Sequence, residues 1–194
     1  MWKSPLIKNI YNKGCVVLTK SRKLACVSSQ PGIRAIGIGE YDAANIIQTT
    51  STGVTSLPAI YDTNTIARLE LKNTTTKFLE NGVSGGDSRS SGVTGNIICV
   101  FNVPAGGDVE TTLFVEQLLK GEVVLFLETK AGLIFAAGVQ NGAIAITIDG
   151  DTGGTIGDLN GYTVTFQTME PEFARKYVLT GTALTDYASA LMPY

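Results

Sequence analysis

The sequence predicts a mainly β protein, an antiparallel β-sandwich or β-barrel with one flanking α-helix. Of its 194 residues 22 are glycine, which together with frequent threonine, valine and isoleucine is typical of short strands joined by turns. Several segments alternate apolar and polar residues, whereas only one has the period of an amphipathic helix. A charged content of 16% is low for a soluble monomer, so we expect partners to cover part of the surface.

The first 60 residues are predicted to form an extended basic N-terminal arm with short strands. Residues 1–39 contain seven basic residues and no acid, whereas the rest of the chain contains eight basic residues and seventeen acids, a difference of −9. Short apolar segments are separated there by polar residues, proline and glycine. Such an arm can bind nucleic acid, a membrane surface or the acidic body of a neighbouring copy, and its apolar clusters favour the protein contact.

Residues 61–182 are predicted to form the β-sandwich or barrel domain. It begins with a strand at 67–72, in which apolar residues alternate with charged ones and leave a charged outer face. The segment 81–95 contains five glycines and four serines, so we expect a mobile loop before a strand at 96–103.

One helix is predicted at 108–120. Asp108 can cap its first turn, and apolar residues recur along it with helical spacing. We expect Leu113, Phe114 and Leu118 to lie in the core beneath this helix.

Further strands are predicted after the helix. Asn141-Gly142 is a typical hairpin turn, so we expect the strands on either side of it to pair with each other. The predicted strands are 122–129, 133–139, 143–148, 162–168 and 176–180, with turns at 130–132 and 140–142, and residues 183–194 form a C-terminal tail.

Residues for the common kinds of catalysis are missing. The chain has no histidine, the usual general base near neutral pH and the commonest metal ligand. Cys15, Cys26 and Cys99 match no structural zinc spacing, and we interpret them as reduced thiols. Gly37-Ile-Gly39 lacks the third glycine of a dinucleotide fingerprint, and we interpret these glycines as letting a strand bend. We predict no enzyme and no cofactor, although a carboxylate pair for glycoside hydrolysis stays open because sequence gives no separation.

The segment 149–161, DGDTGGTIGDLNG, is the candidate binding loop. Asp149 and Asp151 match the first two ligand positions of an EF-hand calcium loop, but the ligands at positions 5 and 12 of that pattern are missing. Three interpretations stay open: a calcium loop with Asp149, Asp151 and Asp158 as ligands, a solvated turn, or a loop that becomes ordered against a neighbouring subunit.

The sequence contains no segment near the roughly 20 apolar residues of a membrane-spanning helix. Its N-terminus also lacks the apolar region of a secretory signal. We therefore expect a protein that is made in the cytosol and has no membrane partner.

The elements from about residue 60 to 181 follow one another in a specific order. A strand with a charged outer face, a glycine-rich loop, a strand and one helix precede the remaining strands. The most specific segment is Gly157-Asp-Leu-Asn-Gly-Tyr-Thr-Val-Thr-Phe166, which follows a Thr/Gly-rich loop and precedes the acidic Glu170-Pro-Glu172. This combination resembles structural proteins of tailed bacteriophages, in particular small tail-tube-like or tail-ring proteins, including those of crAss-like and related phages.

The resemblance implies a β-sandwich or barrel whose copies join their sheets around a homo-oligomeric ring, often of six subunits. Stacked rings would form a channel through which DNA passes without sequence-specific binding, and an acidic lumen would repel its phosphates. It implies a non-enzymatic subunit of the virion tail, made in the host cytoplasm, that also contacts other tail proteins. We place the assembly contacts in the arm 1–60 and in the loops 81–95 and 149–161.

An alternative function is a monomeric β-sandwich module for binding or adhesion. In that case Asp149, Asp151 and Asp158 would hold calcium at the rim of the sandwich. The alternative predicts a calcium-dependent rise in the thermal midpoint, because a ligand that binds only the folded form stabilises it.

Overall fold

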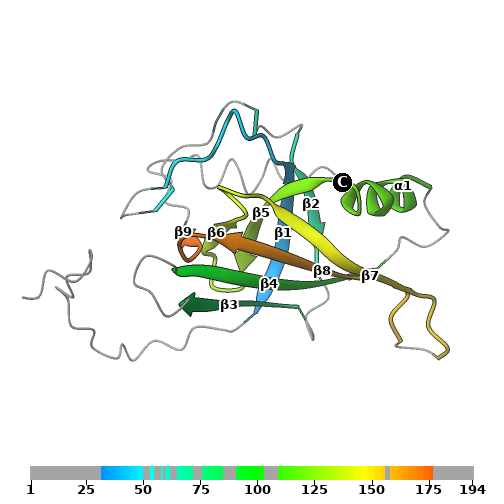
Figure 1. Cartoon of the computed structure of the whole chain (residues 1–194). Coiled ribbons are helices and arrows are strands. Elements are labelled where there is room, and N and C mark those ends of the chain that lie inside the picture. The colour runs from blue at the N-terminus through cyan, green and yellow to red at the C-terminus, as the bar shows by residue number, and fades with distance from the viewer. Residues whose placement is uncertain are drawn as a thin grey trace, which may run out of the picture.

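The computed structural model confirms the predicted class, with nine strands in one antiparallel sheet and a single helix among the described residues (Figure 1). The described residues are 32–49, 53–54, 58, 60–61, 65–71, 76–84, 91–102, 109–155 and 158–176. The elements are β1 (Ile33–Glu40), β2 (Ala67–Glu70), β3 (Lys77–Ser84), β4 (Ser91–Asn102), α1 (Val109–Leu118), β5 (Glu122–Thr129), β6 (Ile134–Ala137), β7 (Ala143–Asp151), β8 (Gly161–Glu170) and β9 (Arg175–Lys176).

The sheet folds over into two layers that share β5 as their junction. The front layer has the strand order β7-β8-β4-β3, and the rear layer consists of β2, β1, β5, β6 and β9. One edge of β5 pairs with β1 along its length, so β6 and β7 must share the other edge, one after the other. The front strands cross β1 at a steep angle (Figure 1), which is the arrangement of an orthogonal sandwich.

The chain passes from the rear layer to the front layer in the turn between β6 and β7. Gly138 and Gly142 have φ angles of 72° and 73°, a left-handed conformation that glycine adopts without a steric penalty. The prediction that the strands beside Asn141-Gly142 pair with each other is wrong, because β6 and β7 lie in line along β5. The turn therefore changes the layer of the chain rather than reversing it into a hairpin.

The main core lies between the two layers. Side chains from β1 and β5 in the rear layer meet side chains from β4 and β8 in the front layer, and α1 closes one end through Val115 and Leu118. The largest fully buried members include Ile36, Ile97, Leu125, Leu127, Val164 and Phe166.

A second core covers the other face of the rear layer. Val124, Phe126 and Ala136 point away from the front layer and pack against Ile47, Val54, Tyr61 and Ile66 from the chain between β1 and β2. The small residues of β1 make room for this cover: a Cβ at Gly37 would lie 3.1 Å from Ile66 Cγ2, and one at Gly39 would lie 3.1 Å from Tyr61 Cδ1. Besides the predicted freedom to bend, these glycines give the strand room for the close approach of Ile66 and Tyr61.

The expected boundary of the N-terminal arm at residue 60 is wrong. β1 lies inside the rear layer, paired with β2 on one side and with β5 on the other, and Ile47 and Val54 belong to the second core. The sequence of the short apolar segment at 33–39 does not reveal that β2 and β5, which lie far away in the chain, pair with it on both sides. The part of the arm at 1–31 and the predicted C-terminal tail at 183–194 lie outside the described residues.

The predicted helix is confirmed as α1, with two of its three predicted core residues facing the core, whereas the predicted cap Asp108 lies outside the described residues. Leu118 is buried and Phe114 is partly buried against the main core, but Leu113 is exposed. Successive residues of a helix are turned by about 100°, so Leu113 faces away from the narrow stripe that touches the sheet.

The two predicted loops are shorter than expected. Ser84 pairs with Ser91, so most of the segment 81–95 belongs to β3 and β4. The loop expected at 149–161 is reduced to 152–160, because β7 runs to Asp151 and β8 begins at Gly161. Gly95 lies within β4 because there is no space for a side chain at this position: a Cβ there would overlap Thr168 Oγ1.

Candidate functional site

The outer surface of the front layer is an open sheet face. Alternation in β4 sends Ile97, Cys99 and Phe101 into the main core, so Asn96 and Ile98 point outward. We define the open face as the outward-pointing residues Lys77, Leu79, Asn81 and Val83 of β3, Gly92, Thr94, Asn96 and Ile98 of β4, Ile144, Ile146, Thr147, Asp149 and Asp151 of β7, and Thr163, Thr165, Gln167 and Met169 of β8.

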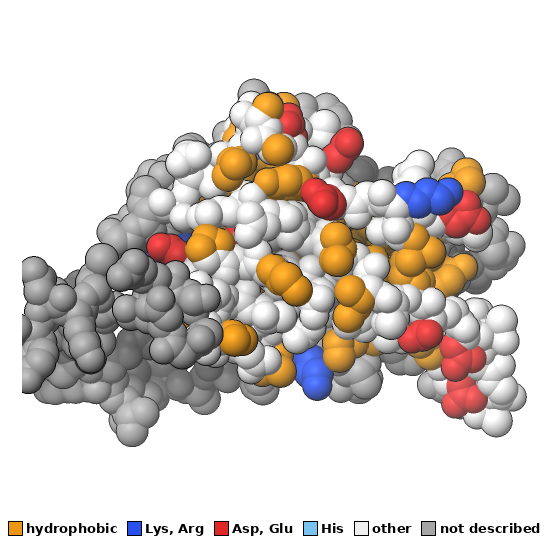
Figure 2. All heavy atoms as spheres, in the orientation of Figure 1, with side chains coloured by type: hydrophobic (Ala, Val, Ile, Leu, Met, Phe, Trp, Pro, Cys, Tyr) orange, Lys and Arg blue, Asp and Glu red, His pale blue; other side chains and the backbone are white. Residues whose placement is uncertain are grey.

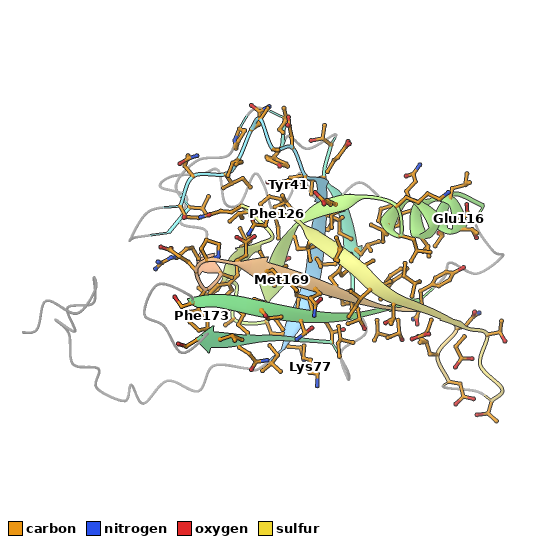
Figure 3. The ribbon with its side chains drawn as sticks, viewed as in Figure 1. Tyr41, Lys77, Glu116, Phe126, Met169 and Phe173 are labelled. Atoms are coloured by element: carbon orange, nitrogen blue, oxygen red, sulfur yellow. The ribbon has the colours of Figure 1, made fainter. Side chains whose placement is uncertain are left out.

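The open face is apolar or neutral except at its margins. Leu79, Val83, Ile144, Ile146 and Met169 are 45% to 64% exposed, and Figure 2 shows apolar side chains spread over the face between uncharged polar ones. Its charged residues are Lys77 at the β3 edge and two aspartates at the end of β7. Figure 3 labels Met169 near the end of β8 and Lys77 at the lower margin of the face. An exposed surface of this composition is typical of a protein contact.

The strand β3 forms a free edge of the sheet. Its eight residues pair with β4 on one side, and no described residue pairs with it on the other. At the opposite end of the strand order, β2 is an edge of only four residues. A long edge strand exposes unpaired backbone N–H and C=O groups, to which another chain can add a strand.

Two glutamates hold the corner of the sandwich beside this face. Glu170 accepts hydrogen bonds from the backbone N–H groups of Gln140 and Asn141, at 3.1 and 3.3 Å, and Glu80 accepts one from Ala174 at 2.6 Å. Burial raises the pKa of both carboxyl groups, and these N–H bonds oppose the rise. The cavity between them has a volume of about 10 Å³, the space of one water molecule, and we interpret the pair as holding the corner together through its hydrogen bonds.

A charged cluster joins the three strands at the β2 end of the rear layer. Glu128 on β5 is 9% exposed and pairs with Arg34 of β1 and with Nη2 of Arg68 at 3.2 Å. The Arg68 side chain is 6% exposed and also contacts Glu70, so this residue of the predicted charged outer face is covered rather than exposed to solvent. Because a buried carboxylate is tolerated only when it is paired, we interpret this cluster as a structural link that ties β1 and β2 to β5.

The three candidate calcium ligands do not form a cluster. Asp151 Oδ1 accepts the Gly153 N–H at 2.9 Å, and Asp158 Oδ2 accepts the N–H groups of Gly154 and Thr155 at 3.0 and 2.7 Å. Asp149 lies on β7 opposite Thr163. Within the described residues no group of three or more Asp, Glu, His or Cys side chains is arranged to hold a metal ion. Asp151 and Asp158 therefore act as hydrogen-bond acceptors that shape their own loop.

Neither the open face nor the buried charges were predicted from the sequence. The neutral outward residues Thr163, Thr165 and Gln167 of β8 could have revealed the face, because a solvent-facing side of a strand usually carries charge. No local pattern distinguishes Arg68, which is buried by its partner strands, from an exposed arginine. Cys15 and Cys26 lie outside the described residues, and Cys99 is buried in the main core.

Comparison of the chain with protein-family models, with curated proteins and with solved structures found no match. Among the described residues, no helix is long and apolar enough to cross a membrane.

Proposed function

We propose that this protein is a non-enzymatic structural subunit of a bacteriophage virion, which assembles with copies of itself into a tail tube or tail ring through which DNA passes. The observation that carries this proposal is the free edge of β3, next to an open and nearly uncharged sheet face. The resemblance of the sequence to tail proteins supplies the virion context.

Among the described residues, the edge of β3 lacks the features that usually prevent strand addition. Natural proteins protect edge strands with charges, proline, bulges or covering loops. Of its eight residues only Lys77 and Glu80 are charged, and Glu80 is turned inward to hold Ala174. The other edge of the sheet is β2, so pairing of β3 with β2 of the next copy is a head-to-tail contact, which closes into a ring when the rotation allows it.

The charge distribution fits a channel for DNA. Residues 40–194 contain eight basic residues and seventeen acids, which favours a lumen that repels phosphates and does not bind DNA sequences. The basic residues at 1–39 would contact the acidic bodies of neighbouring subunits and of other tail proteins. A ring of six copies is the arrangement that the resemblance favours.

Mass photometry and negative-stain electron microscopy of the purified full-length chain at micromolar concentration test this proposal. We expect rings or tubes of uniform diameter. A sample that stays monomeric at several salt concentrations contradicts assembly through the edge.

A pair of proline variants tests the edge itself. Because N–H groups alternate along a strand, one of Val83→Pro and Ser84→Pro removes an N–H that faces β4, and the other removes an N–H that faces the open edge. We expect one variant to lower the melting temperature and the other to keep the fold while abolishing rings. Rings that persist in both variants contradict pairing through this part of β3.

A further inference from the structure

We propose that the open face of the front layer packs against the same face of a second copy, about a twofold axis parallel to the strands and midway between β8 and β4. This contact is distinct from the edge pairing that would build a ring. It would join two chains whether or not rings form, so either contact can fail without the other.

The register of the front layer makes the apolar residues at its two margins complementary to each other. Leu79 on β3 is level with Asn96, which is level with Gln167, which in turn is level with Ile144 on β7. Leu79 and Ile144 therefore lie in one row at opposite margins of the face. A twofold axis parallel to the strands exchanges the margins and keeps the row, so Leu79 of one copy faces Ile144 of the other.

The middle of the same row is self-complementary as well. The axis places Asn96 of one copy opposite Gln167 of the other, because β4 and β8 lie on either side of it. Both side chains end in an amide, which donates and accepts hydrogen bonds. The row thus places apolar side chains on apolar ones and amides on amides.

The charges at the margins are complementary under the same axis. Lys77 is level with Ile98, Thr165 and Thr147, and Asp149 lies two residues further along β7. Lys77 of one copy therefore lies beside Asp149 of the second copy, and symmetry repeats the pair. The two lysines stay on opposite margins, so no like charges meet.

The size of the face predicts a weak but specific contact. Four strands about 4.8 Å apart and about seven residues long at ~3.3 Å each cover on the order of 450 Å² per copy. The pair would bury about 900 Å², which lies below the usual size of a stable interface, so we expect a dissociation constant in the micromolar range. A surface of this size is sensitive to a single charge placed at one of its apolar side chains.

Two charge variants and their mixture test the proposal by sedimentation equilibrium. Leu79→Lys and Ile144→Glu each place a charge opposite an apolar side chain twice per dimer, so we expect each to weaken dimerisation at least about tenfold. In an equimolar mixture, Lys at 79 of one chain faces Glu at 144 of the other, and the remaining Leu79 and Ile144 face each other. We expect the mixture to form a heterodimer.

Leu113→Lys is the matched control, because Leu113 is as exposed as Leu79 but lies on α1 outside the open face. We expect this variant to dimerise like the unmodified protein, and thermal unfolding checks that all three variants keep the fold. Dimerisation that survives Leu79→Lys, or a mixture that stays dissociated, overturns the proposal.

Crosslinking identifies the contact even when larger assemblies are present. Cys99 is buried and its pKa is raised to about 12, so it does not compete for a maleimide, and Cys15 and Cys26 are replaced by serine. With a short bismaleimide we expect a mixture of Leu79→Cys and Ile144→Cys chains to form dimers, whereas Leu79→Cys alone does not. Equal crosslinking of Leu79→Cys with itself rules out the proposed axis.

Discussion

The two layers of the sandwich differ in how many of their faces are covered. The rear layer is buried on both faces, by the front layer on one side and by residues between β1 and β2 on the other. The front layer is buried on its inner face only, and its outer face is open over most of its area. The difference shows that the chain supplies a cover for one layer and leaves the other without one among its described residues.

The strand sequences of the two layers reflect this difference. β5 reads EVVLFLET and is buried at six consecutive positions, the pattern of a strand with both faces covered. β8 reads GYTVTFQTME and alternates between buried and partly exposed residues. Since the outward residues of β8 are threonine and glutamine rather than lysine and glutamate, this strand is suited to a second, protein-covered environment.

The largest expected effect separates the two faces of one strand. Phe166 and Met169 both lie on β8, but Phe166 is fully buried in the main core and Met169 is the most exposed large apolar residue of the open face. We expect Phe166→Ala to lower the free energy of unfolding by about 3 to 5 kcal/mol and Met169→Ala to change it by less than about 0.5 kcal/mol. Urea denaturation at low protein concentration measures both, and similar losses would show that the front layer is covered on both faces.

The next effect compares a glycine of the rear layer with one of the front layer. A side chain at Gly37 meets Ile66 and Phe126 in the second core, whereas a Cβ at Gly92 would contact only the Glu170 carbonyl oxygen, at 3.6 Å. We therefore expect Gly37→Val to lower the free energy of unfolding by about 1 to 3 kcal/mol through overpacking. Gly92→Val is its matched control, and chemical denaturation should find it close to neutral.

A smaller effect concerns the corner where the layers meet. Burial raises the pKa of Glu170 above its ordinary value of 4.5, so the folded protein binds this proton more tightly than the unfolded chain does. The free energy of unfolding should therefore rise as the pH falls from neutral through the raised pKa, and this rise should end near pH 4.5. Glu170→Gln keeps an acceptor oxygen for Gln140 and Asn141 but does not titrate.

The measurement is the melting temperature between neutral pH and about pH 4.5, compared for the unmodified protein and Glu170→Gln. We expect a flatter pH dependence in the variant and a further flattening when Glu80→Gln is added, because burial also raises the pKa of Glu80. An unchanged pH profile in both variants would mean that the corner carboxylates do not distinguish folded from unfolded protein.

The smallest effect concerns the loop between β7 and β8. Asp158→Ala removes the acceptor for the N–H groups of Gly154 and Thr155 in an exposed loop, and we expect a loss of less than about 1 kcal/mol in global stability. Hydrogen exchange at Gly154 and Thr155 should nevertheless become faster. Protection that persists at both amides would show that the backbone alone maintains this turn.

Local sequence patterns were sufficient to predict most of the strands and the helix. They were not sufficient to predict which side chains the rest of the fold buries. The alternation in β8 and the helical spacing in α1 could be recognised because they depend on residues close in sequence. The burial of Arg68 could not, because it depends on Glu128, which lies 60 residues away on another strand. The exposure of Leu113 likewise depends on how narrow a stripe of α1 the sheet touches.

The sequence by itself determined a mainly antiparallel β protein with one helix, because glycine-rich turns and short alternating segments leave few other folds. Only the tertiary structure decided that β1 lies inside the sheet, that the turn at Asn141-Gly142 connects two layers, and that one sheet face is open. The physical reason is that an apolar residue is buried only by what lies opposite it. Gly37, Ile66 and Phe126, for example, pack together although they come from segments far apart in the chain.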